Sequence, residues 1–305
     1  MTDNISDIRF LHRNEIDIEK WDRCILNSTN GLIYARSFYL DTMAANWSAL
    51  VEGDYNAVMP LTWNRKYGFS YLYQPAFTAQ LGLFAGDPDN QKLIELFISH
   101  MKKHFRFCEI HLNYANDPAE CIRRINYTLP LAKPYTEIRN GYKKRLLENL
   151  AESEKNQMNY SRSEDFSSTI PLFRREYGKR FPHVKARHYQ QFELLCHKIS
   201  KIKMLFVRQV TDVSGNLLSS SIFFKDEHRI YNIMSVTLKS GREKKSQFFL
   251  LDQLFREFSA NDLVFDFEGS EVPGIAEFYR KFGPALSTYP FLRYNSLPFP
   301  FRFFK

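Results

Sequence analysis

The chain has 305 residues and a formal net charge of +8, and 44% of its residues are hydrophobic, with 28 Phe and 17 Tyr in the chain. This length favours two domains of about 150 residues each, and the apolar content suffices for two cores. No run approaches the roughly 18 apolar residues of a membrane-spanning helix, and the first residues lack the pattern of a signal peptide.

Cysteine and histidine usage excludes several classes of protein. The four cysteines lie far apart, with no CxxC pair, which argues against structural zinc and fits a reducing cytoplasm. None of the eight histidines stands at a catalytic-triad or metal-ligand spacing, so we expect neither a hydrolase nor a metal-dependent enzyme. The cysteines are Cys24, Cys108, Cys121 and Cys196.

The positive charge has two interpretations. One is a solubilising surface. The other is a polyanionic partner, such as a phosphorylated cofactor, a nucleotide-linked precursor or RNA. No zinc-finger or RNA-binding signature accompanies the basic runs, so direct recognition of nucleic acid is less favoured. These runs are residues 143–145, 174–175, 185–187 and 242–245.

In chain order, the first half predicts two helices, three antiparallel strands, a longer helix and a final strand. Gly53-Asp54 and Tyr67-Gly68 supply the turns between the strands, because both dipeptides favour chain reversal. The longer helix carries apolar residues at a spacing of three to four residues. The predicted ranges are 19–26, 37–43, 47–52, 56–63, 69–73, 90–105 and 108–112.

Residues 135–159 are charge-rich and helix-prone, with only Leu146, Leu147 and Leu150 as a thin apolar stripe. This composition predicts one helix that links two domains. The predicted boundaries are therefore residues 1–134 for the first domain, 135–159 for the linking helix and 160–305 for the second domain.

The second half repeats the order of the first: two helices, three antiparallel strands, a helix and a strand. Only this half continues into one more helix, around Tyr279. The asymmetry predicts a single working site, in the second half. The predicted ranges are 164–177, 186–199, 203–211, 217–225, 229–236, 246–258 and 263–267.

The additional helix follows an acidic turn, Glu268 to Glu271, and Gly283-Pro284 ends it because glycine tolerates a left-handed cap and proline cannot continue a helix. Polar residues between a strand end and a helix start commonly build a ligand site. Its inward face has apolar residues at i, i+3, i+4 and i+7. These are Ile275, Phe278, Tyr279 and Phe282.

The second half resembles the GNAT superfamily of N-acyltransferases. The resemblance rests on the order of elements, on Arg242-x-x-Lys245 before the long helix, and on Phe278-Tyr279-x-Lys281-x-Gly283, with Pro284 where the superfamily has an aromatic residue. The DFEGS turn and the duplicated arrangement resemble the branch related to Fem-type aminoacyl transferases, which attach amino acids to peptidoglycan precursors. The resemblance implies an α+β (α/β) fold of two tandem GNAT-like domains, each a mixed, mostly antiparallel sheet flanked by helices.

In the GNAT fold, backbone amides at the N-terminus of the long helix hold the pyrophosphate of the cofactor. Lys245 and Gln247 occupy positions where the superfamily has small residues. This departure weighs against acetyl-CoA, because a side chain there hinders close approach to the backbone. The cofactor-binding residues that the resemblance implies are Val236, Gly241, Arg242, Lys244, Lys245 and Ser246.

Three side chains are candidates for catalysis. Tyr279 aligns with the tyrosine that protonates the departing thiolate in many GNAT enzymes; the alternative is that its ring only fills the apolar face. Asp266 and Glu268 alternate with phenylalanines and so lie on one strand face. Glu268 is the candidate base for the incoming ammonium. The alternative for both carboxylates is structural, as helix caps or as partners of Arg280 or Lys281.

Three functions remain open at this point. The first is a direct transfer of an acyl or aminoacyl group from a thioester, such as acyl-CoA, or a tRNA ester to an amine on a small molecule or cell-wall precursor. The second is a Fem-like transferase that requires aminoacyl-tRNA, although residues 135–159 leave no room for a two-helix arm. The third is a degenerate GNAT-like pair that binds a ligand without turnover.

Overall fold

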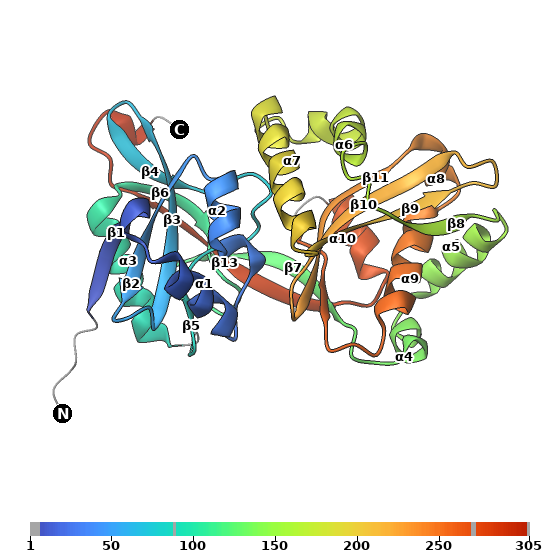
Figure 1. The fold of residues 1–305 in the computed structure, drawn as a ribbon, viewed down its shortest axis with the longest axis horizontal. Helices are drawn as coiled ribbons and strands as arrows, with labels where there is room; N and C mark the ends of the chain where they lie inside the picture. The colour runs from blue at the N-terminus through green and yellow to red at the C-terminus, as the bar shows by residue number, and fades with distance from the viewer. Residues whose placement is uncertain (1–6, 88–89, 270–272, 304–305) are drawn as a thin grey trace. The chain divides into compact units, whose positions relative to one another are not determined.

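The computed structural model describes residues 7–87, 90–269 and 273–303. The chain divides into two units, Met1–Arg124 with Thr288–Lys305, and Ile125–Ser287. Figure 1 shows the fold of each. Each unit has a mixed, mostly antiparallel sheet flanked by helices, as the sequence predicts.

In the first unit the strands run in the order β1-β2-β3-β4-β6-β13, with the short β5 beside β3. Neighbours are antiparallel except β4 and β6, which run parallel because α3 crosses over between them. The elements are β1 (Ile8–His12), α1 (Ile18–Asn27), α2 (Ser37–Met43), β2 (Asn46–Glu52), β3 (Ala57–Lys66), β4 (Phe69–Tyr73), β5 (Phe84–Ala85), α3 (Gln91–His104), β6 (Phe107–His111), β13 (Ala285–Asn295) and a final 3-10 turn, η4 (Phe301–Phe303).

The helix α3 covers the core of this unit. Its side chains Ile94, Phe97 and Met101 are buried against the sheet, as the three-to-four spacing predicts. The side chain of Asn90 caps the helix by accepting a hydrogen bond from the Leu93 amide at 3.1 Å.

In the second unit the order is β7-β12-β11-β10-β9-β8, and only β11 and β12 run parallel, joined by the crossover helix α9. The elements are β7 (Ile122–Pro130), α4 (Tyr135–Asn140), α5 (Lys144–Glu154), β8 (Asn159–Ser163), α6 (Thr169–Tyr177), η3 (Gly178–Arg180), α7 (Ala186–Lys201), β9 (Leu205–Thr211), β10 (Leu217–Lys225), β11 (Arg229–Thr237), α8 (Lys239–Glu243), α9 (Ser246–Phe258), β12 (Val264–Asp266) and α10 (Pro273–Arg280).

Helices cover both faces of this second sheet. Phe223 of β10 lies near Phe265, whose ring contacts Phe255 of α9 at 4.9 Å. The next residue, Phe224, stacks instead on Phe192 of α7 at 5.8 Å. Successive residues of a strand point to opposite faces, so α9 and α7 lie on opposite sides of the sheet.

Residues 135–159 differ from the prediction of one linking helix. They form two helices, α4 and α5, and continue into β8, all within the second unit. Leu146 and Leu150 are buried in the same core as Leu254 of α9. The thin apolar stripe is therefore sufficient, because it packs on a neighbouring helix rather than bridging two domains.

The end of the chain also differs from the prediction, which assigns residues 160–305 to the second domain. Residues 288–305 belong to the first unit, where β13 pairs with β6 and Arg293 lies opposite Glu109. The strands β1, β7, β8 and β13 are not predicted by the sequence. The pentapeptide of β8, NYSRS, shows why, since it lacks an apolar alternation and depends on pairing with β9.

Two global features agree with the composition. No helix among the described residues is both long and apolar enough to cross a membrane. The four cysteines are free thiols, and Cys108 and Cys196 are buried. These two buried thiols pack as small apolar core residues.

The end of α10 gives a test of this packing. Gly283 has a backbone φ of +67°, and a Cβ there would lie 2.1 Å from the carbonyl oxygen of Gly141. We expect Gly283→Ala to lower the free energy of unfolding by about 2–3 kcal/mol, measured by urea denaturation, because both the backbone conformation and the space are unsuited to a side chain.

The matched control is Gly274→Ala inside α10, where an added Cβ meets no atom within 4 Å. We expect a change of no more than about 1 kcal/mol there, in the stabilising direction. Equal losses in the two variants would contradict the close contact at Gly283.

Candidate active site

A cavity of about 450 Å³ lies in the second unit where β11, α8, α9 and α10 meet. Three basic side chains, Arg180, Arg242 and Lys245, contribute to its lining. The remaining side chains combine aromatic rings with hydrogen-bonding groups, which is the usual composition of a site for a small molecule or cofactor. They include Tyr177, Phe181, Asn232, Ser235, Thr237, Gln247, Phe248, Phe278 and Tyr279.

An irregularity in β11 shapes one part of this lining. The register between β10 and β11 shifts by one residue between Ile222 and Phe224, so β11 carries a β-bulge around residues 232–233. The bulge changes the alternation of side chains, and Asn232 and Ser235, three residues apart, both line the cavity. The Ser235 hydroxyl donates a hydrogen bond to Asn232 Oδ1 at 2.7 Å.

Tyr279 of α10 also lines the cavity and contacts Asn232. Its ring packs against Phe267, with centroids 4.8 Å apart, and its hydroxyl is hydrogen-bonded by the Asn232 side chain. Burial raises the pKa of Tyr279 most, and the nearby negative charges of Glu268 and Asp266 raise this pKa further. The phenol therefore keeps its proton at neutral pH, as a proton donor must.

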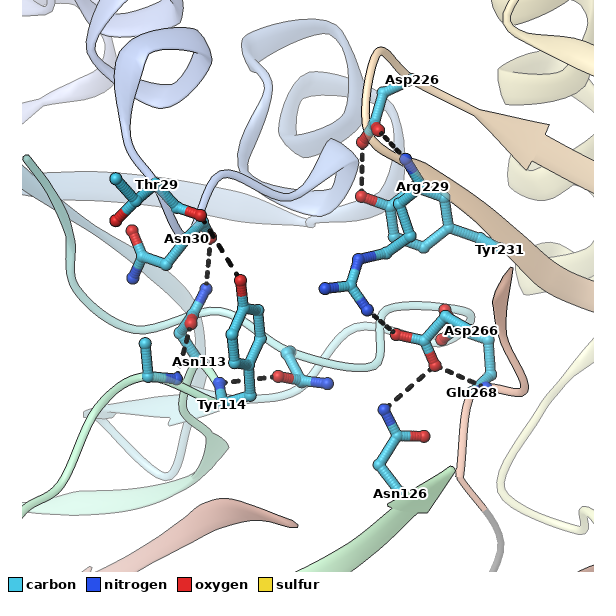
Figure 2. Close-up of polar contacts among 12 residues, drawn as sticks. Thr29, Asn30, Asn113, Tyr114, Asn126, Asp226, Arg229, Tyr231, Asp266 and Glu268 are labelled. Atoms are coloured by element: carbon cyan, nitrogen blue, oxygen red, sulfur yellow. Dashed lines mark hydrogen bonds and ion pairs between the residues drawn. The ribbon is translucent and has the colours of Figure 1, made fainter. Parts of the chain in front are cut away.

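Asp266 lies near Tyr279, and both of its carboxylate oxygens have hydrogen-bond partners. Its Oδ1 accepts hydrogen bonds from Asn126 Nδ2 at 3.0 Å and from the Glu268 amide at 2.9 Å, and its Oδ2 pairs with Arg229 Nη1 at 2.6 Å (Figure 2). Its ionic partner is thus Arg229, rather than the Arg280 or Lys281 that the sequence offers. This set of contacts makes Asp266 a positioning residue for the turn that follows.

Glu268 lies in that turn with a backbone φ of +65°, and Gly269 follows with a φ of +61°. A left-handed conformation is costly for a residue with a side chain, and the hydrogen bond from the Glu268 amide to Asp266 helps to hold it. The Glu268 carboxylate is close enough to raise the pKa of Tyr279. The last residue of the predicted acidic turn, Glu271, lies outside the described residues.

The polar contacts continue from Asp266 to the β10–β11 hairpin. The Arg229 amide donates to Asp226 Oδ1 at 2.8 Å, and the Tyr231 hydroxyl donates to Asp226 Oδ2 (Figure 2). Burial raises the pKa of Asp226 despite these hydrogen bonds. Asp226 therefore holds the backbone of Arg229, and Asp266 holds its side chain.

The loop before α9 departs from a simple phosphate-binding loop. Gly241 is required by close packing, since a Cβ there would lie 2.1 Å from the carbonyl oxygen of Leu218. Lys245 adopts a left-handed conformation, with φ +61°, immediately before Ser246 begins the helix. The Ser246 hydroxyl is buried, faces Gly241 and has no hydrogen-bond partner among the described residues.

The basic side chains of the lining are held differently. Arg242 donates to the Thr237 carbonyl at 2.6 Å and lies 3.4 Å from the Glu176 carboxylate. Lys245 is half-buried and has no ion pair among the contacts described. Lys244, the other lysine of the loop, is directed to Asp212 at 3.8 Å and does not line the cavity.

The structure thus brings only part of the predicted set together. Tyr279, Gly241, Arg242 and Lys245 line the cavity, whereas the predicted Val236, Lys244 and Ser246 do not. Asp266 and Glu268 lie next to Tyr279, outside the lining. Among the described residues, no group of three His, Cys, Asp or Glu side chains could hold a metal ion.

Sequence reasoning missed the lining residues Asn232 and Ser235, because a strict alternation places them on opposite faces of the strand and the bulge has no sequence signature. It also missed Arg180 and Phe181, from the connection between α6 and α7. The nearby basic runs, 174–175 and 185–187, are the only sequence signal for this connection.

In the first unit, the end of β6 is covered by the unit's own chain. The His111 amide donates to Gln74 Oε1 at 3.0 Å, and the Leu81 amide donates to the His111 carbonyl at 2.9 Å. Beyond β6, Asn113 Nδ2 donates to the Asn30 carbonyl at 2.8 Å (Figure 2). Side-chain amides bond backbone groups here, as in a structural network, and Asn30 Oδ1 is buried without a hydrogen-bond partner among the described residues.

No protein-family description and no curated protein matches the sequence. Solved structures do match. FemX superposes with a TM-score of 0.62 at 13% identity, over 92% of this chain and 96% of that chain. A conserved protein of unknown function from Bacteroides thetaiotaomicron has a TM-score of 0.56 at 9% identity, over 94% and 100% of the two chains.

A third match is the C-terminal domain of a protein described as a lysylphosphatidylglycerol synthetase from Agrobacterium fabrum. Its TM-score is 0.55 at 10% identity, over 92% of each chain. Identities this low speak for the fold alone. The chain therefore has the GNAT-like fold of Fem-type proteins, and this likeness extends over nearly its whole length.

Proposed function

We propose that the chain is an acyltransferase that moves an acyl or aminoacyl group from a thioester or tRNA ester to an amine. The observation that carries the proposal is the protonated hydroxyl of Tyr279 in a cavity with Arg180, Arg242 and Lys245. A proton donor for the leaving group and cations for a phosphorylated donor then share one site, and the Glu268 carboxylate lies beside the proton donor.

The proposed reaction is direct. The acceptor ammonium loses a proton to Glu268, directly or through water, and its nitrogen attacks the carbonyl carbon of the donor. The new C–N bond forms as the C–O or C–S bond breaks, and the leaving atom takes the proton of Tyr279. The nitrogen loses its second proton as the amide forms, and this proton returns to the Tyr279 phenolate. The proton held by Glu268 passes to solvent, which restores both groups. A backbone amide freed by the bulge in β11 would stabilise the oxyanion.

The loop favours an aminoacyl ester of tRNA over acyl-CoA as the donor. Gln247, at one of the small-residue positions of the superfamily, uses its side chain to bond Ser221 Oγ at 3.2 Å and Thr237 Oγ1 at 3.3 Å. Lys245 fills the other position. These side chains leave less room for a pyrophosphate against the backbone, but the lysine can still pair with a phosphate as a point charge. The proposed acceptor is an amine of a small molecule or cell-wall precursor.

Removal of one hydroxyl tests the proton donor. We expect Tyr279→Phe to lower kcat about 10²–10³-fold, since the leaving group then departs without general-acid assistance. Tyr142→Phe is the control, because Tyr142 is also buried in this unit, against Phe282, but does not line the cavity. Unchanged turnover in a folded Tyr279→Phe variant would contradict the mechanism and favour a binding protein without catalysis.

Removal of the hydrogen bond from Asn232 tests whether this contact sets the acidity of the Tyr279 hydroxyl. This hydrogen bond lowers the pKa of Tyr279, whereas burial and the charges of Glu268 and Asp266 raise it. Asn232→Ala should therefore make the phenol a weaker acid. We expect kcat to fall about tenfold while KM stays nearly constant, and the basic limb of the pH–rate profile to move to higher pH. Asn216→Ala, in the exposed β9–β10 turn, is the control. A change confined to KM would argue against this role.

A charge reversal tests the donor. We expect wild-type protein to bind aminoacyl-tRNA with a steep salt dependence, and Lys245→Glu to weaken this binding about tenfold, measured by filter binding. Lys239→Glu makes the same charge change at an exposed position outside the lining and should have a smaller effect. A rise in melting temperature with acetyl-CoA that Lys245→Glu abolishes would instead assign an acyl-CoA donor.

A further inference from the structure

Exposed aromatic side chains gather at one place in the first unit. Among the described residues, only three Phe, Tyr or Trp side chains are classed as exposed: Tyr67, Phe299 and Phe303, at 66%, 75% and 69%. Tyr67 lies in the β3–β4 turn, Phe299 precedes the final turn η4, and Phe303 is the last residue of η4. Single exposed apolar residues are ordinary on a protein surface, but a cluster of them indicates an interaction site.

Ring contacts form two groups, Tyr67 and Phe69 with Phe301, and Phe299 with Phe303, and the chain segment 299–303 connects them. We call these five residues the aromatic patch. The Phe301 ring lies 5.2 Å from Phe69 and 6.3 Å from Tyr67, and the rings of Phe299 and Phe303 are 6.0 Å apart. In Figure 1 the red turn near the C-terminus lies beside the β3–β4 hairpin.

Cations are interleaved with these rings. Lys66 Nζ lies 5.2 Å from the centre of the Tyr67 ring, and the Arg302 guanidinium lies 5.2 Å from the centre of the Phe303 ring. An acidic side chain beneath the patch, Glu109, is paired with Arg293 at 3.2 Å. Among the described residues, the patch therefore offers apolar rings and positive charge together, and the neighbouring Glu109 carboxylate, whose side chain is 36% exposed, is paired with Arg293.

We propose that the aromatic patch docks this unit peripherally on a bilayer that carries anionic lipids. Aromatic rings are favoured at the level of lipid headgroups, where one edge is apolar and the other wet. Lys66 and Arg302 lie where they would meet the negative surface potential of such a bilayer. The docking is peripheral, because no helix of the described chain could cross the membrane.

The arrangement of the rings favours this occupant over single-stranded nucleic acid or a protein. The rings of Phe299 and Phe303 are inclined by 84°, and those of Phe69 and Phe301 by 57°, so they form no parallel slots in which bases could stack. Protein interfaces are depleted in lysine at their centre, whereas Lys66 stands directly on the patch.

Vesicle flotation of the full chain tests the proposal. We expect binding to vesicles of phosphatidylcholine mixed with phosphatidylglycerol, weaker binding to phosphatidylcholine alone, and release by high salt as charges are screened. The double variant Phe299→Ser/Phe303→Ser should lower partitioning at least about tenfold, because each ring loses apolar burial. Neutralising Lys66 or Arg302 with glutamine should lower it about fivefold per charge.

The control is the double variant Leu194→Ser/Val213→Ser, which removes two similarly exposed apolar side chains, at 59% and 68%, from the second unit. We expect it to float like the wild type. Because all the mutated side chains are exposed, thermal melting should confirm an intact fold in each variant.

Three outcomes would overturn the proposal. The first is wild-type protein that ignores anionic vesicles. The second is an equal loss of partitioning in the control variant. The third is a patch variant that still floats but has lost self-association or tRNA binding, which would assign the patch to a second copy of the chain or to nucleic acid. None of these outcomes depends on transferase activity, so the two proposals can fail separately.

Discussion

The candidate site depends on one buried ion pair, between Arg229 and Asp266. Two charges removed from water are tolerated only when their remaining hydrogen-bonding capacity is satisfied, and loss of one partner from such a pair typically costs about 3–5 kcal/mol. Here Asp266 also accepts from Asn126 and from the Glu268 amide. The pair therefore joins β11, β12 and β7 and fixes the backbone of the turn from which Glu268 projects.

The parallel pairing of β11 and β12 explains why this ion pair can form. Arg229 begins β11 and is paired with Val264, the first residue of β12, and Tyr231 is paired with Asp266. Asp266 lies two residues beyond Val264 on the same face of the strand, where the Arg229 side chain reaches it. Because α9 crosses over from the end of β11 to the start of β12, its first turn and Lys245 follow the carboxyl end of β11, not the end that carries Arg229. The bulge in β11 then directs Asn232 towards Tyr279.

Much of this arrangement was predictable from the sequence, and the reasons for the rest are specific. The limits of β10 and α9 follow from periodicity, and the structure confirms them. The GNAT-like fold followed from the resemblance, and the similarity to FemX supports it. Gly283 has the left-handed conformation expected of a glycine stop, and α10 ends three residues earlier, at Arg280. The return of residues 288–305 to the first unit was not predictable, because strand order in space need not follow the chain. Gly241 was predicted for cofactor binding, yet its nearest constraint is the Leu218 carbonyl, a tertiary contact that no local pattern encodes.

The net charge of +8 had two interpretations, a solubilising surface and a polyanionic partner. The structure separates the basic residues by what surrounds them. Many are exposed or paired with carboxylates, such as Lys244 with Asp212. Lys245 lines a cavity beside a protonated phenol, and Lys66 lies against an exposed aromatic ring. Lys245 is half-buried, which limits the hydration of its ammonium group, whereas Lys66 is exposed. The two proposals assign a different anion to each lysine, a phosphorylated donor to Lys245 and an anionic lipid surface to Lys66.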